Sequence, residues 1–150
     1  MRIALVVSSY HDFVTTRLET GARALLRERG VADSAIETYP VPGAYELAQA
    51  AHRLAVSGQW HAVVCLGCLI RGETPHFDYI AHAASQGIMR AAQDSGVPVA
   101  FGVLTTNTAE EALARAGDGP ANKGREAAQA AYEMAELYAR LDFETPSSPE

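Results

Sequence analysis

Four short and nearly continuous apolar runs alternate along the chain with longer stretches in which apolar residues recur at helical spacing. The runs cover residues 3–7, 35–41, 62–70 and 97–104. Strands that are apolar along almost their whole length are typical of a parallel sheet covered on both faces. The pattern therefore predicts four buried strands separated by helices.

The stretches between and after these runs carry the spacing and the end signals of helices. The predicted helices cover about residues 14–29, 44–57, 75–95, 108–117 and 127–141. Gly30, Gly58 and Gly96 follow the first three, where glycine commonly ends a helix. Thr108 and Glu111 match a capping box at the start of the fourth helix. One apolar face of the last helix is formed by Ala127, Ala131, Met134, Tyr138 and Leu141.

This order of elements predicts one α/β domain over residues 1–150. The expected fold is a flavodoxin-like, three-layer α/β/α sandwich with a four-stranded parallel sheet and right-handed crossovers. The last residues, about 143–150, are expected to fray. Ligands bind such sheets beyond the carboxyl ends of the strands. The segments expected at those ends are residues 8–12, 40–46, 68–78 and 104–108.

Composition and charge exclude several classes of protein and of ligand. The chain is 48% hydrophobic and 20% charged, which excludes collagen-like, disordered and coiled-coil classes. The net charge is −6 and there is no basic run, whereas a nucleic-acid binder needs a clustered positive face. No apolar stretch approaches the ~20 residues that span a bilayer, and residues 1–9 lack the pattern of an export signal. We therefore expect a cytoplasmic protein that binds neither nucleic acid nor membrane.

Cys65 and Cys68 stand in a C-x-x-C spacing that could indicate redox chemistry or half of a zinc site. Both lie in the third apolar run, where an odd offset places two side chains on opposite faces of a strand. No second cysteine pair completes a metal site. The spacing of His76, Asp78 and His82 matches no common ligand pattern either. Small buried residues are the favoured interpretation, and no metal is expected.

The end of the third run, residues 68–78, is the richest in candidate chemistry. Gly72 lets the backbone approach a ligand, Thr74 can cap a helix, and Pro75 suits a first helical turn. Free N–H groups of that turn could cradle a phosphate. His76 would lie at the positive end of the helix dipole, which favours a neutral imidazole able to accept a proton. A well-capped helix alone would explain Thr74 and Pro75 but not His76.

At the other strand ends, residue chemistry alone does not decide between a functional and a structural role. The ring of Tyr10 could stack on a flat ligand or simply cover the edge of the sheet. Glu46 lies in a first helical turn, where it complements the helix dipole. Arg115 and Lys123 could bind an anion, and a solvated loop would explain them equally well. Two common nucleotide-binding motifs are absent from the sequence: G-x-G-x-x-G does not follow the first run, and G-x-x-x-x-G-K-[ST] does not occur.

Taken together, these segments resemble the 6,7-dimethyl-8-ribityllumazine synthase family of riboflavin biosynthesis. The matching segments follow the family's order and spacing, and they are residues 41–47, 66–79, 101–108, 115–117 and 122–124. The run R-G-E-T-P-H-F-D-Y followed by F-G-V-L-T-T-N-T is highly specific. The resemblance implies condensation of 5-amino-6-(D-ribitylamino)uracil with 3,4-dihydroxy-2-butanone 4-phosphate, giving the lumazine, phosphate and water. It implies no metal and no organic cofactor.

The resemblance also implies a role for each matching residue. His76 is the implied catalytic group and shuttles protons. Residues implied to bind the ribitylaminouracil are Tyr10, Ala44, Tyr45, Glu46, Cys68, Leu69, Ile70 and Phe101. Residues implied to bind the phosphorylated ketone are Glu73, Thr74, Arg115 and Lys123. In the family, the counterparts of Phe101 and Arg115 come from an adjacent subunit, so a homo-oligomer, expected to be a pentamer, is implied.

The chain departs from the family pattern in three places. Tyr10 and His11 stand where the commoner pattern has Phe-Asn, and Pro120 and Ala121 replace a glycine-rich pair, which stiffens that turn. Residues 1–2 lead directly into the first strand, where many members carry a preceding segment that packs on a neighbour; this favours a pentamer over a larger shell. Two alternatives to the enzyme stay open, namely a non-catalytic lumazine- or flavin-binding homologue and a shell-forming one.

Overall fold

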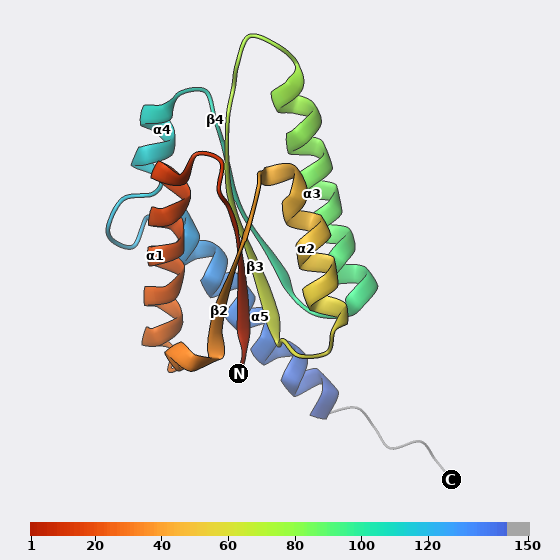
Figure 1. Cartoon of the computed structure of the whole chain (residues 1–150). Coiled ribbons are helices and arrows are strands. Elements are labelled where there is room, and N and C mark those ends of the chain that lie inside the picture. Colours follow the sequence, from red (N-terminus) through yellow and green to blue (C-terminus); the bar gives the residue numbers. More distant parts are fainter. Residues whose placement is uncertain (144–150) are drawn as a thin grey trace.

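The computed structural model describes residues 1–143, which form one parallel sheet enclosed by helices (Figure 1). The strands are β1 (Ile3–Ser8), β2 (Ile36–Val41), β3 (Ala62–Ile70) and β4 (Val99–Thr106). They lie in the order β2-β1-β3-β4, and every neighbouring pair is parallel. The predicted four-stranded parallel sheet is confirmed, with β2 and β4 at its two edges. The tail predicted to fray lies outside the described residues, apart from residue 143.

Helices cover both faces of the sheet. Within residues 1–143 the helices are α1 (Asp12–Glu28), α2 (Ala44–Val56), α3 (His76–Ser95), α4 (Ala109–Ala114) and α5 (Lys123–Phe143). A short 3₁₀ turn, η1 (Asp33–Ala35), precedes β2. Helices α1 and α5 pack together on one face, and α2 and α3 pack together on the other (Figure 1). The predicted three-layer α/β/α sandwich is confirmed.

The central strands are buried on both faces, as their apolar character predicts. Alternate residues of β1 point to opposite sides, so Leu5 belongs to the core under α1 and α5 and Val6 to the core under α2 and α3. Cys65 and Cys68 likewise belong to different cores, which confirms that their side chains lie on opposite faces of β3. Burial raises the pKa of Cys65 to about 12 and that of Cys68 to about 11. Both thiols are free and stay protonated at neutral pH.

The structure corrects several predicted boundaries. Strand β4 lies two residues later than predicted, because β3 runs to Ile70 and pairs there with Thr106. Ala35 belongs to the 3₁₀ turn rather than to β2. The prediction that Thr74 caps α3 is wrong: the N-cap position is Pro75, and no side chain caps this helix.

The ends of α4 and α5 also differ in detail from the sequence pattern. Thr108 caps α4 as predicted, since its Oγ1 accepts the N–H of Glu111 at 3.1 Å. The Glu111 carboxylate accepts from Asn107 N–H instead of completing the reciprocal bond of a capping box. On α5, the apolar face is divided, because Ala127 and Ala131 are buried while Met134 and Leu141 are exposed.

Small residues let α5 approach α1 closely. A Cβ atom at Gly124 would overlap the carbonyl of Leu18 well inside 3.0 Å, a separation that real Cβ atoms essentially never fall below. Four alanines of α5 are buried in the same layer, namely Ala127, Ala128, Ala131 and Ala135. The two helix backbones therefore pack against each other with little side-chain volume between them.

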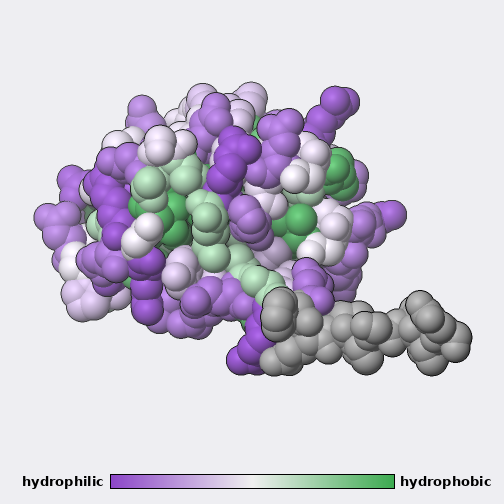
Figure 2. Space-filling view, turned by 90° about the horizontal axis from the view of Figure 1, so that it is seen from below, coloured by the Kyte–Doolittle hydropathy of each residue, from purple (hydrophilic) through white to green (hydrophobic). Residues whose placement is uncertain are grey.

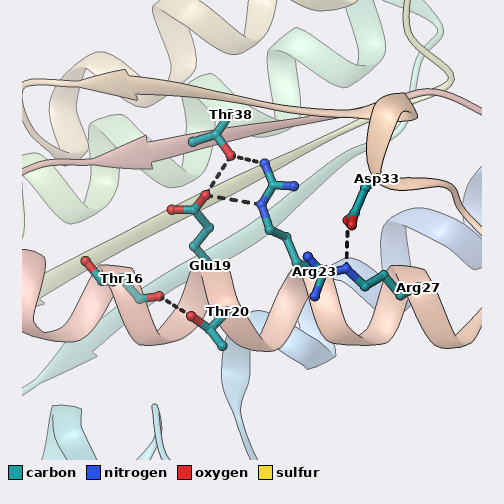
Figure 3. Close-up of polar contacts among 7 residues, drawn as sticks. All are labelled: Thr16, Glu19, Thr20, Arg23, Arg27, Asp33 and Thr38. Atoms are coloured by element: carbon teal, nitrogen blue, oxygen red, sulfur yellow. Dashed lines mark hydrogen bonds and ion pairs between the residues drawn. The ribbon is translucent and has the colours of Figure 1, made fainter.

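Polar contacts join the edge strand β2 to α1 (Figure 3). The hydroxyl of Thr38 donates to Glu19 Oε2 at 2.7 Å and accepts from Arg23 Nη2 at 2.7 Å. Arg23 also pairs with Glu19 one helical turn away. A second ion pair, between Arg27 and Asp33 at 2.7 Å, holds the turn before β2 against the same helix. This network fixes an edge strand that has only one neighbour.

The carboxyl ends of the strands all lie at one end of the molecule. In Figure 1 the strands run upward from the N-terminus, so their carboxyl ends meet at the top. Figure 2 views the opposite end, where hydrophilic side chains surround a smaller hydrophobic area. The polar loops that carry the predicted site residues lie at the end that faces away in Figure 2.

Candidate functional site

A cavity of about 840 Å³ opens at the carboxyl ends of β1, β2 and β3. Its walls come from the β1–α1 turn, the start of α2, the end of β3 and the start of α3. The predicted site residues that line it are Tyr10, Ala44, Tyr45, Glu46, Cys68, Leu69, Ile70, Thr74 and His76. Glu73 does not line the cavity, although Gly72 and Thr74 on either side of it do. We call this cavity the strand-end cleft.

The remaining predicted residues lie elsewhere on the chain. Phe101, Arg115 and Lys123 line a separate cavity of about 320 Å³ between β4 and the start of α5. The two cavities share no lining residue. We call the smaller one the β4-edge cleft, because β4 is an edge strand with one side unpaired by the rest of the sheet. One chain therefore does not bring His76 and Arg115 to a common cavity.

A strained turn presents Tyr10 to the strand-end cleft. The next residue, His11, has φ of 60° in the left-handed region, which is uncommon for a residue other than glycine. The turn is held by backbone bonds: Ser9 N–H donates to the Val41 carbonyl, and the N–H groups of Val14 and Thr15 donate to the His11 carbonyl. Such strain clusters at functional sites, where the surroundings hold the backbone in place.

Aromatic rings support the exposed ring of Tyr10. The Tyr10 side chain is 65% exposed, and its ring centre lies 4.4 Å from the His11 ring. His11 in turn meets Phe13 edge-on at 5.8 Å. Partial burial lowers the pKa of His11, so its ring is neutral near pH 7. The arrangement offers one face of Tyr10 to a flat ligand.

The start of α2 adds a carboxylate to the cleft. Gly43 is the N-cap residue, and Glu46 lies in the first turn, where its N–H donates to the Gly43 carbonyl. A Cβ atom at Gly43 would lie 3.3 Å from Glu46 Oε1, so the carboxylate folds back over the glycine. Ala44 is buried beneath this turn, and Tyr45 is exposed. An ionised carboxylate here can accept hydrogen bonds from ligand hydroxyl groups.

The loop between β3 and α3 brings His76 to the cleft. His76 is the first residue of α3 and is exposed. The N–H groups of this first turn carry no side-chain cap, and uncapped helix N-termini favour anions. Cys68 is buried at the base of the cleft, while Leu69 and Ile70 are half-buried there. The loop thus combines a titratable ring with a backbone environment that suits negative charge.

Further lining residues come from α3 itself. Phe77, Tyr79 and Ile80 also line the strand-end cleft, and sequence reasoning assigned them no role. Tyr79 and Ile80 follow His76 at three and four residues, the spacing that places side chains on one side of a helix. That spacing was the signal that could have identified them.

The β4-edge cleft gathers positive charge from two segments. Arg115 ends α4, where its guanidinium donates to the Glu111 carbonyl at 3.1 Å, a bond that leaves its charge unneutralised. Lys123 begins α5, and its Nζ pairs with Glu126 at 2.9 Å. The exposed ring of Phe101 projects from β4 into the same cleft. This cleft can hold an anion beside an aromatic surface.

Asn122 closes the turn that precedes Lys123. Its buried side chain donates to the carbonyls of Arg17 and Gly117 and accepts from Arg125 N–H. Lys123 N–H donates to the Arg115 carbonyl at 2.9 Å. These bonds keep the two cations close together even though Pro120 stands in this turn. Sequence reasoning gave Asn122 no role.

In the part of the chain that the structure describes, no three His, Cys, Asp or Glu side chains are grouped so that they could hold a metal ion. Among residues 1–143, no helix combines the length and apolar character that crossing a membrane requires.

Comparisons with known proteins agree with one another. A family model described as 6,7-dimethyl-8-ribityllumazine synthase matches residues 1–139. The chain is 48% identical over 141 residues to the 6,7-dimethyl-8-ribityllumazine synthase of Syntrophus aciditrophicus, covering 94% of this chain and 92% of that protein. It is 50% identical over 137 residues to the protein of that name from Chlorobium phaeovibrioides, covering 91% and 88%. A third protein of that name, from Chlorobium chlorochromatii, is 46% identical over 141 residues and is covered to 91%, against 94% of this chain.

Proposed function

This chain belongs to the 6,7-dimethyl-8-ribityllumazine synthase family, and we propose that the strand-end cleft is the main part of its active site. The chain is thereby a transferase of riboflavin biosynthesis. It joins 5-amino-6-(D-ribitylamino)uracil to 3,4-dihydroxy-2-butanone 4-phosphate and releases phosphate and water. The observation that carries the site assignment is that Tyr10, Glu46 and His76, from segments far apart in the sequence, line one cavity.

The strand-end cleft suits the ribitylaminouracil. Its volume of about 840 Å³ lies within the range of small-molecule sites, roughly 300–1,000 Å³. The supported ring of Tyr10 can stack on the pyrimidine, and the Glu46 carboxylate can accept from ribityl hydroxyls. We propose that backbone groups of Cys68, Leu69 and Ile70, at the end of β3, bond the uracil edge.

His76 is the group that we propose moves protons. The 5-amino group attacks the ketone, and loss of water leaves a Schiff base. Phosphate then departs by elimination, which leaves an enol that tautomerises to a carbonyl. The nitrogen that bears the ribityl group attacks this carbonyl, and loss of a second water closes the ring. Each step transfers a proton near neutral pH, which suits an imidazole. Holding two substrates together supplies much of the remaining acceleration.

The β4-edge cleft supplies the groups that the first cleft lacks. Departing phosphate needs positive charge, and Arg115 with Lys123 can provide it. Since these residues line a different cavity of the same chain, we propose that a neighbouring chain brings its β4-edge cleft against the strand-end cleft. Glu73, exposed beside the first cleft, would contact the phosphorylated ketone there together with Thr74.

A closed ring of chains satisfies such an arrangement at every site, and we propose a homopentamer in the cytoplasm. In a ring, each chain offers its strand-end cleft to one neighbour and its β4-edge cleft to the other. The unpaired edge of β4 and the exposed Phe101 support this side of the sheet as the contact. Light scattering of the purified protein measures the mass, and a monomeric mass at active concentrations would contradict the ring.

Activity is tested directly by mixing the purified protein with both substrates and following lumazine fluorescence against a blank without protein. We expect protein-dependent product, and His76→Ala should lower kcat by roughly 10²–10⁴-fold. His82→Ala is the matched control, because His82 is exposed on the same helix and lies outside the cleft lining. A loss under about threefold for His76→Ala would remove the imidazole from this role. No product from the wild type would leave a non-catalytic binding homologue or a shell-forming one.

A further inference from the structure

Arg71 connects three segments at the rim of the strand-end cleft. It directly follows β3, and its backbone N–H donates to the Thr106 carbonyl at 2.8 Å, which extends the β3–β4 pairing by one residue. Its side chain then turns toward α3 and toward the loop between β4 and α4. Sequence reasoning placed Arg71 in the family motif and gave it no role.

The guanidinium makes three side-chain contacts. It lies over the ring of Phe77 at 4.5 Å from the ring centre. Its Nη2 is 3.4 Å from Asp78 Oδ1, and its Nε donates to Asn107 Oδ1 at 3.3 Å. The planar group therefore stacks with its face while it bonds with its edge, a combination that lysine does not offer. Phe77 and Asp78 belong to the first turn of α3, and Asn107 to the β4–α4 loop.

The loop that receives Arg71 is itself fixed. Asn107 N–H donates to the Glu111 carboxylate, and Thr108 Oγ1 accepts from Glu111 N–H. The first turn of α3, by contrast, has no side-chain cap, because Pro75 occupies the N-cap position. Arg71 thus joins the first turn of α3, which no side chain caps, to the β4–α4 loop, which its own hydrogen bonds hold in place.

The contacts are better suited to positioning than to stability. The side chains of Arg71 and Asp78 are 49% and 53% exposed, and ion pairs of this exposure stabilise folded proteins little. The residue that benefits is His76, which immediately precedes Phe77 on the same turn. Misplacing a catalytic group by a fraction of a bond length costs rate without unfolding the protein.

We propose that Arg71 is a positioning residue whose guanidinium holds the first turn of α3 against the β4–α4 loop and so fixes the imidazole of His76 in the cleft. This inference rests on the role proposed for His76. It separates Arg71 from Arg115, because Arg71 acts through its neighbours in the fold and Arg115 acts on the phosphate.

A double-mutant cycle tests the proposal. The kcat and both KM values are measured for wild type, Arg71→Ala, His76→Ala and the double variant. We expect Arg71→Ala to lower kcat roughly tenfold and to leave both KM values within about twofold. In the His76→Ala background the same substitution should change kcat by less than about twofold, since no imidazole remains to be positioned. Arg90→Ala is the matched control, because Arg90 pairs with Asp94 on the exposed side of the same helix.

Each other outcome overturns the proposal. Equal fold-losses in both backgrounds would mean that Arg71 supports the fold generally. A raised KM for the phosphorylated substrate with unchanged kcat would mean that Arg71 binds the anion itself. An Arg71→Ala protein as active as Arg90→Ala would mean that the contacts of the Arg71 guanidinium do not contribute to catalysis.

Two further results keep this test separate from that of the proposed function. If His76→Ala retains full kcat, the imidazole role fails, and the Arg71 proposal fails with it. If His76→Ala loses activity and Arg71→Ala does not, only the Arg71 proposal fails. Should Arg71→Ala not fold, Arg71→Lys passes through the same cycle; it keeps the charge without the planar group, and wild-type kcat would overturn the proposal.

Discussion

Mixing two variants, each impaired in a different cleft, tests whether the active site is shared between chains. His76→Ala damages the strand-end cleft, and Arg115→Ala damages the β4-edge cleft, and the two cavities of one chain have no lining residue in common. If each site takes one cleft from each of two chains, co-assembly creates sites in which both clefts are intact. In an equal and random mixture about a quarter of the sites are intact, while either variant alone has none.

The assay follows lumazine formation at a concentration of the phosphorylated substrate well below its wild-type KM, where loss of the Arg115 anchor is felt most. The two variants are unfolded and refolded together so that their chains exchange, and they are compared with variants refolded apart and then mixed. We expect about a quarter of wild-type activity after joint refolding. Wild type refolded with the chain that carries both substitutions is the internal check: a shared site predicts about a quarter of full activity, and a site within one chain about a half.

Failure to recover activity, together with about half activity in the internal check, would refute the shared site. It would show that Phe101, Arg115 and Lys123 act within their own chain or do not act at all. Light scattering of the refolded mixture confirms that assembly has occurred. Native mass spectrometry, in which the two variants differ in mass, confirms that the assemblies contain both chains, so that missing activity is not mistaken for missing exchange.

Three other predictions follow from single residues. Arg115→Ala should raise the KM for the phosphorylated substrate with a smaller effect on kcat, and an unchanged KM in steady-state kinetics would contradict the anchor role. Gly124→Ala should lower the free energy of unfolding by about 3 kcal/mol, because its Cβ overlaps the Leu18 carbonyl; Gly117→Ala, with nothing within 4 Å, is the control in a denaturant titration. The free energy of unfolding should fall as pH rises from about 9 toward 11, because the Cys68 thiol has a pKa of about 11 in the folded protein and of 9.0 in the unfolded chain. The free energy of unfolding of Cys68→Ala should fall less across that range.

The sequence predicted the sheet and its layers because a strand that is buried on both faces is apolar along almost its whole length. The same period-two geometry correctly placed Cys65 and Cys68 in different cores. Boundaries were less certain, because the end of β4 depends on how far β3 extends beside it. Thr74 was assigned as a cap on residue type alone, whereas Pro75 takes that position in the structure.

The family resemblance implied both the site residues and their division between adjacent chains. It named residues that line two different clefts of one chain, and the structure brings Tyr10, Glu46 and His76 together in one of them. The distance of Arg115 from that cleft follows from β4 lying at the edge of the sheet, a property of strand order that no local pattern encodes. The contacts of Arg71 were also hidden, since they join segments 36 residues apart in the chain.

The presence of two separate cavities on one chain has a genetic consequence. In the proposed ring, every chain contributes to two active sites. A chain damaged in both the strand-end cleft and the β4-edge cleft therefore inactivates sites that it shares with intact neighbours. A cell expressing damaged and intact alleles equally would keep about a quarter of its output rather than half. An allele damaged at both faces should therefore lower output further than an allele that yields no protein.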